Sequence, residues 1–272
     1  MTVRLVKLVI SIIVWVFDRL KNALYRLFGF ETPGMCVVLY YHAIFPEQRD
    51  RFSHQMDDLV RIAQPVSGSE MESLEKGISY VVVTFDDGFR CVVENALPEL
   101  IVRNIPCTVF VPSGCLGKTP SWIQKNNTDK NQEVVMDENE VKALKKIGLV
   151  SIGSHTVSHT RLTSLGEEEA RYEILRSKET LEAIIGEEIQ FLSFPYGAFN
   201  EKHIEMARQG GYKRVFSITP VCAFIDSDEY VTGRVRVDPT DWGIEFRLKL
   251  LGTYRWLPFA FLLKSKIHAF LN

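Results

Sequence analysis

The sequence has few cysteines and no pattern among them. Five occur in 272 residues, at Cys36, Cys91, Cys107, Cys115 and Cys222, and no two form a CxxC pair. Their odd number and scattered positions argue against a disulfide framework and a zinc ribbon. They are typical of small apolar side chains in a reducing compartment, where thiols stay unpaired.

The chain also lacks an excess of charge of one sign. Lys and Arg number 32 and Asp and Glu number 34, so the formal net charge is -2. Nucleic-acid binding usually needs a strongly basic face, so we expect no nucleic-acid partner. Hydrophobic residues make up 46% of the chain and charged residues 24%, which permits a core and excludes disorder. No repeat, low-complexity tract or linker divides the sequence.

Long apolar runs are missing near the N-terminus. The apolar stretch from Leu8 to Phe17 is about half of the ~20 residues that span a bilayer. Polar residues recur there at three-, four- and seven-residue steps, as one stripe of a helix opposite an apolar face: Arg4, Lys7, Ser11, Asp18, Asn22 and Arg26. We expect residues 1–32 to form an amphipathic helix in a membrane interface. Packing on the domain and a tilted signal anchor are the alternatives.

The C-terminal segment, residues 253–272, has a similar composition. Its aromatic and apolar residues are followed by Lys264 and Lys266, which suits an interface or a hydrophobic hairpin over the core. Two such segments favour peripheral attachment to a membrane. If the first one spanned a bilayer, cations at its end would keep the rest of the chain cytoplasmic: Arg19, Lys21 and Arg26. We therefore expect the cytoplasmic face of the inner membrane.

Strand-like and helix-like patterns alternate between residues 35 and 237, which predicts an α/β fold with a mainly parallel sheet or barrel. Short apolar runs mark the expected strands: Cys36–Tyr41, Tyr80–Phe85, Cys107–Val111, Val150–Gly153, Gln190–Phe194, Arg214–Ile218 and Val231–Val237. Capping patterns mark the expected helices: Asp137 to about Ile147, Glu167–Ile185 before Gly186, and Asn200 to Gly210. The longest irregular segment, 114–132, has the length of a loop that covers a site.

Two adjacent carboxylates follow the expected strand at 80–85. The three valines at 81–83 favour a buried strand, and Asp86 and Asp87 would be costly inside a core. In parallel α/β folds, sites are built at the carboxyl ends of the strands. Adjacent residues point to opposite sides, so the two carboxylates can have different roles.

Two histidines four residues apart follow another expected strand. His155 and His159 lie on one face of a helical turn and can bind one cation together with Asp87. Three such ligands leave coordination positions open, which is typical of a catalytic rather than a structural site. We expect one divalent ion, zinc first, with cobalt, nickel or manganese as alternatives. A metal sensor or buffer is a further possibility.

Three motifs in order carry a family resemblance. They are Thr84-Phe85-Asp86-Asp87-Gly88, His155-Thr156-Val157-Ser158-His159 and Phe194-Pro195-Tyr196-Gly197. The chain resembles the polysaccharide deacetylases, carbohydrate esterase family four, over about residues 37–250. The resemblance implies a distorted (β/α) barrel with fewer than eight repeats, in a catalytic domain of residues 33–252. It also implies hydrolysis of an N-acetyl group on a sugar.

Several roles follow from this resemblance. Asp87, His155 and His159 would bind the metal, and Asp86 would be the general base. The main-chain N–H of Tyr196, after Pro195, would help hold the oxyanion. The chemistry of the residues agrees, because a metal lowers the pKa of its bound water toward about 7 and a neighbouring carboxylate can take its proton.

The chain departs from the family pattern in its general acid. It has no Leu-x-His motif near its end, where His268 lies in the cationic tail. The start Leu39-Tyr40-Tyr41-His42 instead resembles a circularly permuted subgroup, in which the acid comes from the first strand. We therefore expect His42 to protonate the leaving amine.

A second departure is Ser193, where many members have an arginine that orients the base. Arg234 or Arg236 could supply that cation. Asp241 and Trp242 resemble part of the fourth family motif, although Asp241 could also cap a helix.

The sequence thus predicts a metal-dependent N-deacetylase of an N-acetylated glycan. A membrane-bound enzyme on the cytoplasmic side would meet a lipid-linked amino sugar more readily than a finished polymer. Mature poly-N-acetylglucosamine or peptidoglycan is the alternative substrate. An inactive glycan-binding module is the alternative function, because the arginine and histidine of the family pattern are displaced.

Overall fold

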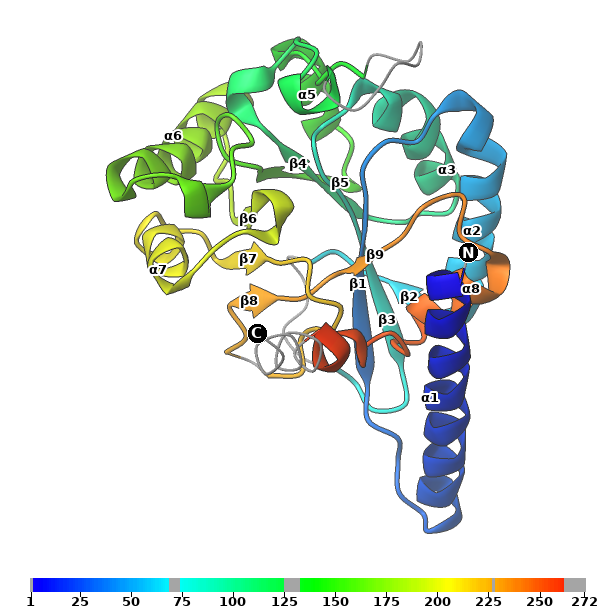
Figure 1. Cartoon of the computed structure of the whole chain (residues 1–272). Helices are drawn as coiled ribbons and strands as arrows, with labels where there is room; N and C mark the ends of the chain where they lie inside the picture. Colours follow the sequence, from blue (N-terminus) through cyan, green and yellow to red (C-terminus); the bar gives the residue numbers. More distant parts are fainter. Residues whose placement is uncertain (1, 69–73, 125–132, 227, 262–272) are drawn as a thin grey trace.

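The structure is a computed structural model that describes residues 2–68, 74–124, 133–226 and 228–261. Within these residues, nine strands form one sheet (Figure 1). The strands are β1 (Met35–Tyr41), β2 (Gln64–Pro65), β3 (Ser79–Phe85), β4 (Cys107–Val111), β5 (Val150–Ser154), β6 (Phe191–Ser193), β7 (Arg214–Phe216), β8 (Val231–Thr232) and β9 (Val235–Arg236). The helices are α1 (Thr2–Leu27), α2 (Arg49–Ile62), α3 (Leu97–Val102), α4 (Ser121–Gln124), α5 (Glu138–Lys145), α6 (Glu167–Ile185), α7 (Glu201–Gln209) and α8 (Gly243–Leu250).

Every strand pair of the sheet is parallel, in the order β8-β7-β6-β5-β4-β3-β1-β9, and β2 pairs with β3. The sheet curves into a partial barrel with helices outside it (Figure 1). The predicted parallel α/β fold is therefore confirmed, and the arrangement is consistent with a distorted barrel. The core consists mainly of aliphatic side chains from the central strands and the helices around them.

The expected strand at 231–237 is divided between the two edges of the sheet. Its first part, β8, pairs with β7, and its second part, β9, pairs with β1. Only Gly233 and Arg234 lie between them, so this segment crosses the opening of the barrel. A Cβ atom on Gly233 would lie 2.4 Å from the carbonyl oxygen of Thr219, so the crossing needs a residue without a side chain.

Several local predictions also hold. Asp137 caps α5 by accepting hydrogen bonds from Asn139 N and Glu140 N, both at 2.9 Å. Asn200 caps α7 through His203 N, and Gly186 ends α6 with a φ of 71°. The strands expected at 190–194 and 214–218 are shorter in the structure, because only three residues of each pair with a neighbour.

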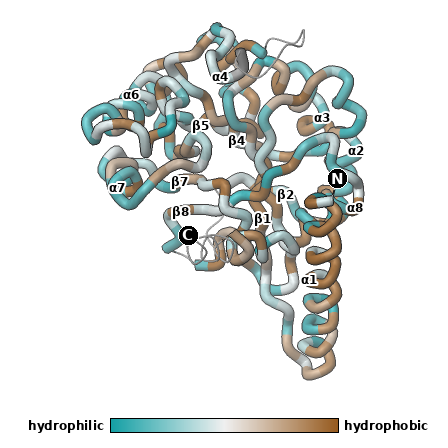
Figure 2. Tube along the Cα trace, viewed as in Figure 1, coloured by the Kyte–Doolittle hydropathy of each residue, from teal (hydrophilic) through white to brown (hydrophobic). Residues whose placement is uncertain are grey.

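Helix α1 packs beside α8 and extends past the end of the sheet where the strands begin (Figure 1). Its apolar residues give it the strong brown colour in Figure 2. None of the helices in the described ranges is long and apolar enough to cross a membrane. The structure describes only part of the predicted C-terminal segment, residues 253–272, because Lys264, Lys266 and His268 lie outside the described residues.

Candidate metal centre and active site

The three sequence motifs meet at one edge of the sheet. Strands β3, β5 and β6 are parallel and end at Phe85, Ser154 and Ser193, and each motif continues from its strand end. Because the carboxyl ends of parallel strands lie at the same edge, the fold brings residues about 70 and 110 positions apart into one site.

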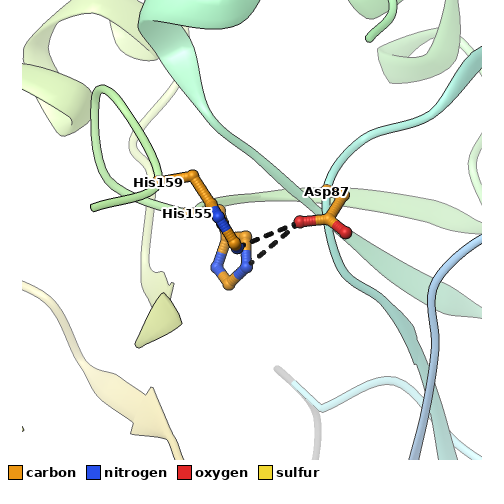
Figure 3. A group of neighbouring side chains, drawn as sticks. All are labelled: Asp87, His155 and His159. Atoms are coloured by element: carbon orange, nitrogen blue, oxygen red, sulfur yellow. Dashed lines mark ion pairs between the residues drawn. The ribbon is translucent and has the colours of Figure 1, made fainter. Parts of the chain in front are cut away.

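Asp87, His155 and His159 form a compact group in this site (Figure 3). The Asp87 Oδ1 atom lies 3.1 Å from His159 Nε2 and 3.7 Å from His155 Nε2. All three candidate ligand atoms lie within 4.8 Å of one another, and all three side chains are buried. Asp87 Oδ1 is also buried without a hydrogen-bond partner in the described structure. A buried carboxylate oxygen beside two imidazole nitrogens fits a divalent cation, which would satisfy all three groups.

The site residues have unusual backbone conformations. Of six non-glycine residues with positive φ in the described ranges, four belong to the three motifs: Asp87 (70°), Thr156 (64°), His159 (57°) and Tyr196 (59°). Each such residue costs on the order of 1–3 kcal/mol, and such strain is concentrated at functional sites. These conformations therefore lower the stability of the fold, and they occur in the three motifs that meet at the site.

Residues 155–160 form a loop instead of the expected helical turn, because Thr156 and His159 have positive φ, and neighbouring groups fix this loop. His155 Nδ1 lies 2.7 Å from the carbonyl oxygen of Ser193, so this nitrogen carries the proton and leaves Nε2 as the ligand atom. The Glu173 carboxylate on α6 accepts hydrogen bonds from Val157 N at 2.9 Å and Ser158 N at 2.8 Å. The sequence analysis missed Glu173, because a glutamate within a helix carries no local signal of a contact with a distant loop.

Burial keeps both histidines neutral. It lowers the pKa of His155 to about 4 and the pKa of His159 to about 2. Neutral imidazole is the form that binds a metal. Burial, together with the charge of Asp86, raises the pKa of Asp87 well above its usual range. A cation at this position would reverse that effect by stabilising the carboxylate.

Asp86 forms a buried ion pair with Arg234. Its two carboxylate oxygens accept hydrogen bonds from the Arg234 guanidinium at 2.7 and 2.8 Å, and the arginine side chain is fully buried. Burial alone would raise the pKa of Asp86, but the charge and hydrogen bonds of Arg234 hold it well below its usual range. Arg234 also donates to the hydroxyls of Thr84 and Ser193. Arg236, the other candidate, is exposed on β9.

Ser193, at the position where the resemblance implies an arginine, contacts the guanidinium of Arg234. Its hydroxyl accepts a hydrogen bond from Arg234 at 2.7 Å, and its carbonyl oxygen contacts His155. The guanidinium reaches Asp86 from the segment that crosses the barrel opening, instead of from the strand end at 193.

His42 follows β1 at the same edge of the sheet and is half-buried. Burial lowers the pKa of His42, while the Asp86 carboxylate opposes this. A charge on His42 would in turn lower the pKa values of His155 and His159. The three imidazoles and Asp86 therefore share one electrostatic environment.

Aromatic side chains cover the histidine side of the site. The Trp122 ring stacks on His159 with centroids 4.1 Å apart, and the Tyr196 ring lies 4.8 Å from His159. The Arg161 guanidinium lies over the Tyr196 ring, 4.9 Å from its centroid. Trp122 belongs to the irregular segment expected to cover a site, but the sequence did not indicate which of its residues would reach the histidines.

Comparison with known proteins assigns the family. The sequence model described as polysaccharide deacetylase matches residues 74–215, just over half of the chain. The chain belongs to the polysaccharide deacetylase family. Members of this family are hydrolases that act on the amide bonds of acetylated sugars, so the predicted enzyme class is confirmed.

Individual members are similar over much of the chain. The Bacillus subtilis protein YxkH, provisionally described as a polysaccharide deacetylase, is 26% identical over 227 residues, covering 79% of this chain and 76% of that protein. A Staphylococcus aureus poly-beta-1,6-N-acetyl-D-glucosamine N-deacetylase is 24% identical over 165 residues, or 58% of this chain and 54% of the enzyme. The chain thus matches about half the length of the S. aureus enzyme.

A solved structure shows the same fold. IcaB from Ammonifex degensii superimposes with a TM-score of 0.67 at 24% identity, covering 80% of this chain and 98% of that one. Two residues of the site, His42 and Arg234, lie outside the region matched by the polysaccharide deacetylase model. The circularly permuted subgroup stays a prediction.

The structure places the last two predicted positions of this polysaccharide deacetylase in another cluster. Asp241 accepts hydrogen bonds from Lys249 Nζ at 2.6 Å and from the Asp238 main chain. Trp242 is 39% exposed, and the Arg4 guanidinium lies 4.3 Å from its ring centroid. These contacts join the segment after β9 to α8 and to the start of α1, so both residues have a visible structural role there.

Proposed function

We propose that the chain is a metal-dependent N-deacetylase that hydrolyses the acetamide of an N-acetylated amino sugar in a glycan. The observation that carries the proposal is the buried Asp86–Arg234 pair beside Asp87, His155 and His159. Three protein ligands leave coordination positions open for water and substrate, and an adjacent carboxylate supplies a base.

Asp87, His155 and His159 would hold the divalent ion, with zinc as the first choice and cobalt, nickel or manganese as alternatives. When bound, such an ion lowers the pKa of a water molecule and polarises an amide carbonyl. Asp86 accepts the proton of the attacking water. Arg234 keeps Asp86 ionised and fixes its two oxygens, so Asp86 is held in the form that can accept a proton.

Two further groups complete the proposed reaction. His42 donates a proton to the nitrogen as the C–N bond breaks, which produces a free amine and acetate. The main-chain N–H of Tyr196 would help hold the oxyanion, and the left-handed turn in which Tyr196 and Gly197 have φ values of 59° and 61° supports this role. Trp122 and Tyr196 provide aromatic surface for a sugar ring beside His159.

The test measures acetate release by the metal-loaded full-length protein from a panel of N-acetylated glycans. We expect release by the wild type and its loss in Asp86→Asn, with unchanged metal content. A metal-loaded wild type that releases no acetate from any member of the panel contradicts the proposal. Glycan retention that is equal in wild type and Asp86→Asn, without turnover, would instead indicate a binding module.

We further propose a lipid-linked amino sugar as the substrate, with the protein on the cytoplasmic face of a membrane. Large apolar side chains of α1 that are exposed, such as Phe17 and Leu20, and the five free cysteines support this location. The S. aureus relative, named as a poly-beta-1,6-N-acetyl-D-glucosamine N-deacetylase, favours a polymer. To distinguish the two substrates, the rate of acetyl loss is compared for a polyprenyl-phosphate-linked amino sugar and for poly-N-acetylglucosamine. Both are supplied at equal acetyl concentration. Faster loss of one acetyl group from the polymer would reject the lipid-linked substrate.

A further inference from the structure

Helix α1 contacts the domain through its polar side. Ser11 is its only fully buried residue in the described range, and its hydroxyl accepts a hydrogen bond from Trp256 Nε1 at 3.0 Å. Seven residues before it, Arg4 Nε donates to Glu245 at 2.7 Å. Seven residues after it, Asp18 accepts two hydrogen bonds from Arg255, at 2.6 and 2.8 Å. The part of the polar stripe formed by Arg4, Ser11 and Asp18 therefore faces the protein, whereas Arg26 is exposed.

The opposite side of α1 is apolar and exposed. Large side chains recur there at three- and four-residue steps over the whole helix: Leu5, Val9, Ile13, Val16, Leu20, Leu24 and Leu27, with Val6 and Phe17 beside them. Phe17 is 67% exposed and Leu20 is 62% exposed. Phe28 and Phe30 continue the exposed apolar surface past the helix end. A continuous exposed apolar face of this length marks an interaction site.

The charges on α1 indicate which partner covers this face. Arg19, Lys21 and Arg26 are exposed, and they stand on turns that also carry the apolar residues. Asp18 is the only acidic residue of the helix, and Arg255 neutralises it. A second copy of α1 on this face would bring cations of like sign together. An anionic surface with an apolar interior would complement both the cations and the apolar side chains.

We propose that the outer face of α1 binds an anionic phospholipid surface, with the helix lying in the plane of the headgroups. Contacts from Arg4, Ser11 and Asp18 hold the domain to the other side of the helix. The helix thus connects protein and lipid through two different faces. The proposal does not depend on the proposed deacetylation.

The test measures binding of the full-length protein to phosphatidylcholine vesicles with and without phosphatidylglycerol, by co-sedimentation. We expect binding that is stronger with phosphatidylglycerol and weaker at high salt. The double variant Phe17→Ser/Leu20→Ser should bind at least about tenfold more weakly for each side chain removed. Arg19→Gln/Lys21→Gln should lose about fivefold for each cation, on the mixed vesicles only.

Matched controls come from other exposed apolar residues. Val102 and Ile225 are 82% and 73% exposed outside α1, so Val102→Ser/Ile225→Ser should bind vesicles like the wild type. Acetate release from a soluble substrate should be unchanged in all these variants, which separates lipid binding from catalysis. Absence of wild-type binding overturns the proposal. So does a dimer in sedimentation experiments that dissociates in Phe17→Ser/Leu20→Ser.

Discussion

Replacing Arg234 by methionine would remove one member of the buried ion pair and keep the other. In the wild type, the guanidinium donates to both oxygens of Asp86, to the hydroxyls of Thr84 and Ser193, and to the carbonyl oxygen of Ser217. Removing one partner of a buried pair costs about 3–5 kcal/mol, because the remaining charge is left without compensation. We therefore expect the free energy of unfolding of Arg234→Met to be lower than that of the wild type by this amount at neutral pH.

The pH dependence of this loss is diagnostic. In the wild type, the pKa of Asp86 is below its unfolded value, so the stabilising contribution of Asp86 is present above about pH 4 and is lost only in stronger acid. In Arg234→Met, burial of Asp86 is no longer opposed by the guanidinium, and we expect it to raise the pKa of Asp86 above the unfolded value. The variant should therefore lose stability as the pH rises through about 4 toward 7.

Urea unfolding of both proteins between about pH 4 and pH 7 tests this reasoning. The difference in free energy of unfolding should grow with pH. The double variant Arg234→Met/Asp86→Asn serves as the control, because it carries no ionisable group at either position. The difference between its free energy of unfolding and that of the wild type should depend little on pH. Equal stability of Arg234→Met and wild type at neutral pH, or a constant difference across the range, would refute the buried pair.

Three further outcomes follow from the site. Asp86→Asn should reduce kcat about 100- to 10,000-fold, measured by acetate release, with metal content by elemental analysis unchanged. His159→Ala should lose the metal. Zinc at about 100 times its Kd should stabilise the wild type by ~2.7 kcal/mol in thermal unfolding, and it should not stabilise His159→Ala. His42→Gln should keep metal and fold but lower kcat about 100-fold or more, and wild-type acetate release at neutral pH would show that another group is the acid.

The cluster of candidate metal ligands could be predicted from the sequence because each motif is local and follows a strand. The register of a parallel sheet then brings Asp87, His155 and His159 to one edge without further information. The capped helices were predictable for the same reason, since Asp137, Asn200 and Gly186 act on residues within one turn.

The choice between Arg234 and Arg236 was not predictable. The two are two positions apart, so a continuous strand would place both on the same side of the sheet. Arg234 instead lies between β8 and β9, where the chain leaves one edge and joins the other, and its side chain enters the barrel. That division depends on how two distant strands, β7 and β1, curve toward each other.

The orientation of α1 relative to the domain also could not be predicted from the sequence. An amphipathic helix usually buries its apolar side, and only the positions of Glu245, Arg255 and Trp256, more than 200 residues further along the chain, show that this helix is held by its polar side. The periodicity predicted the helix and its two faces, but not which face meets the protein.

The crossing at Gly233 and Arg234 has a practical consequence for shortening the chain. A fragment limited to the region that the family model matches, residues 74–215, would retain the three candidate metal ligands. It would lack β1 with His42, and it would lack the guanidinium that keeps Asp86 ionised. Such a fragment would also leave β3 without its partner strand β1, so the matched region does not contain the complete site.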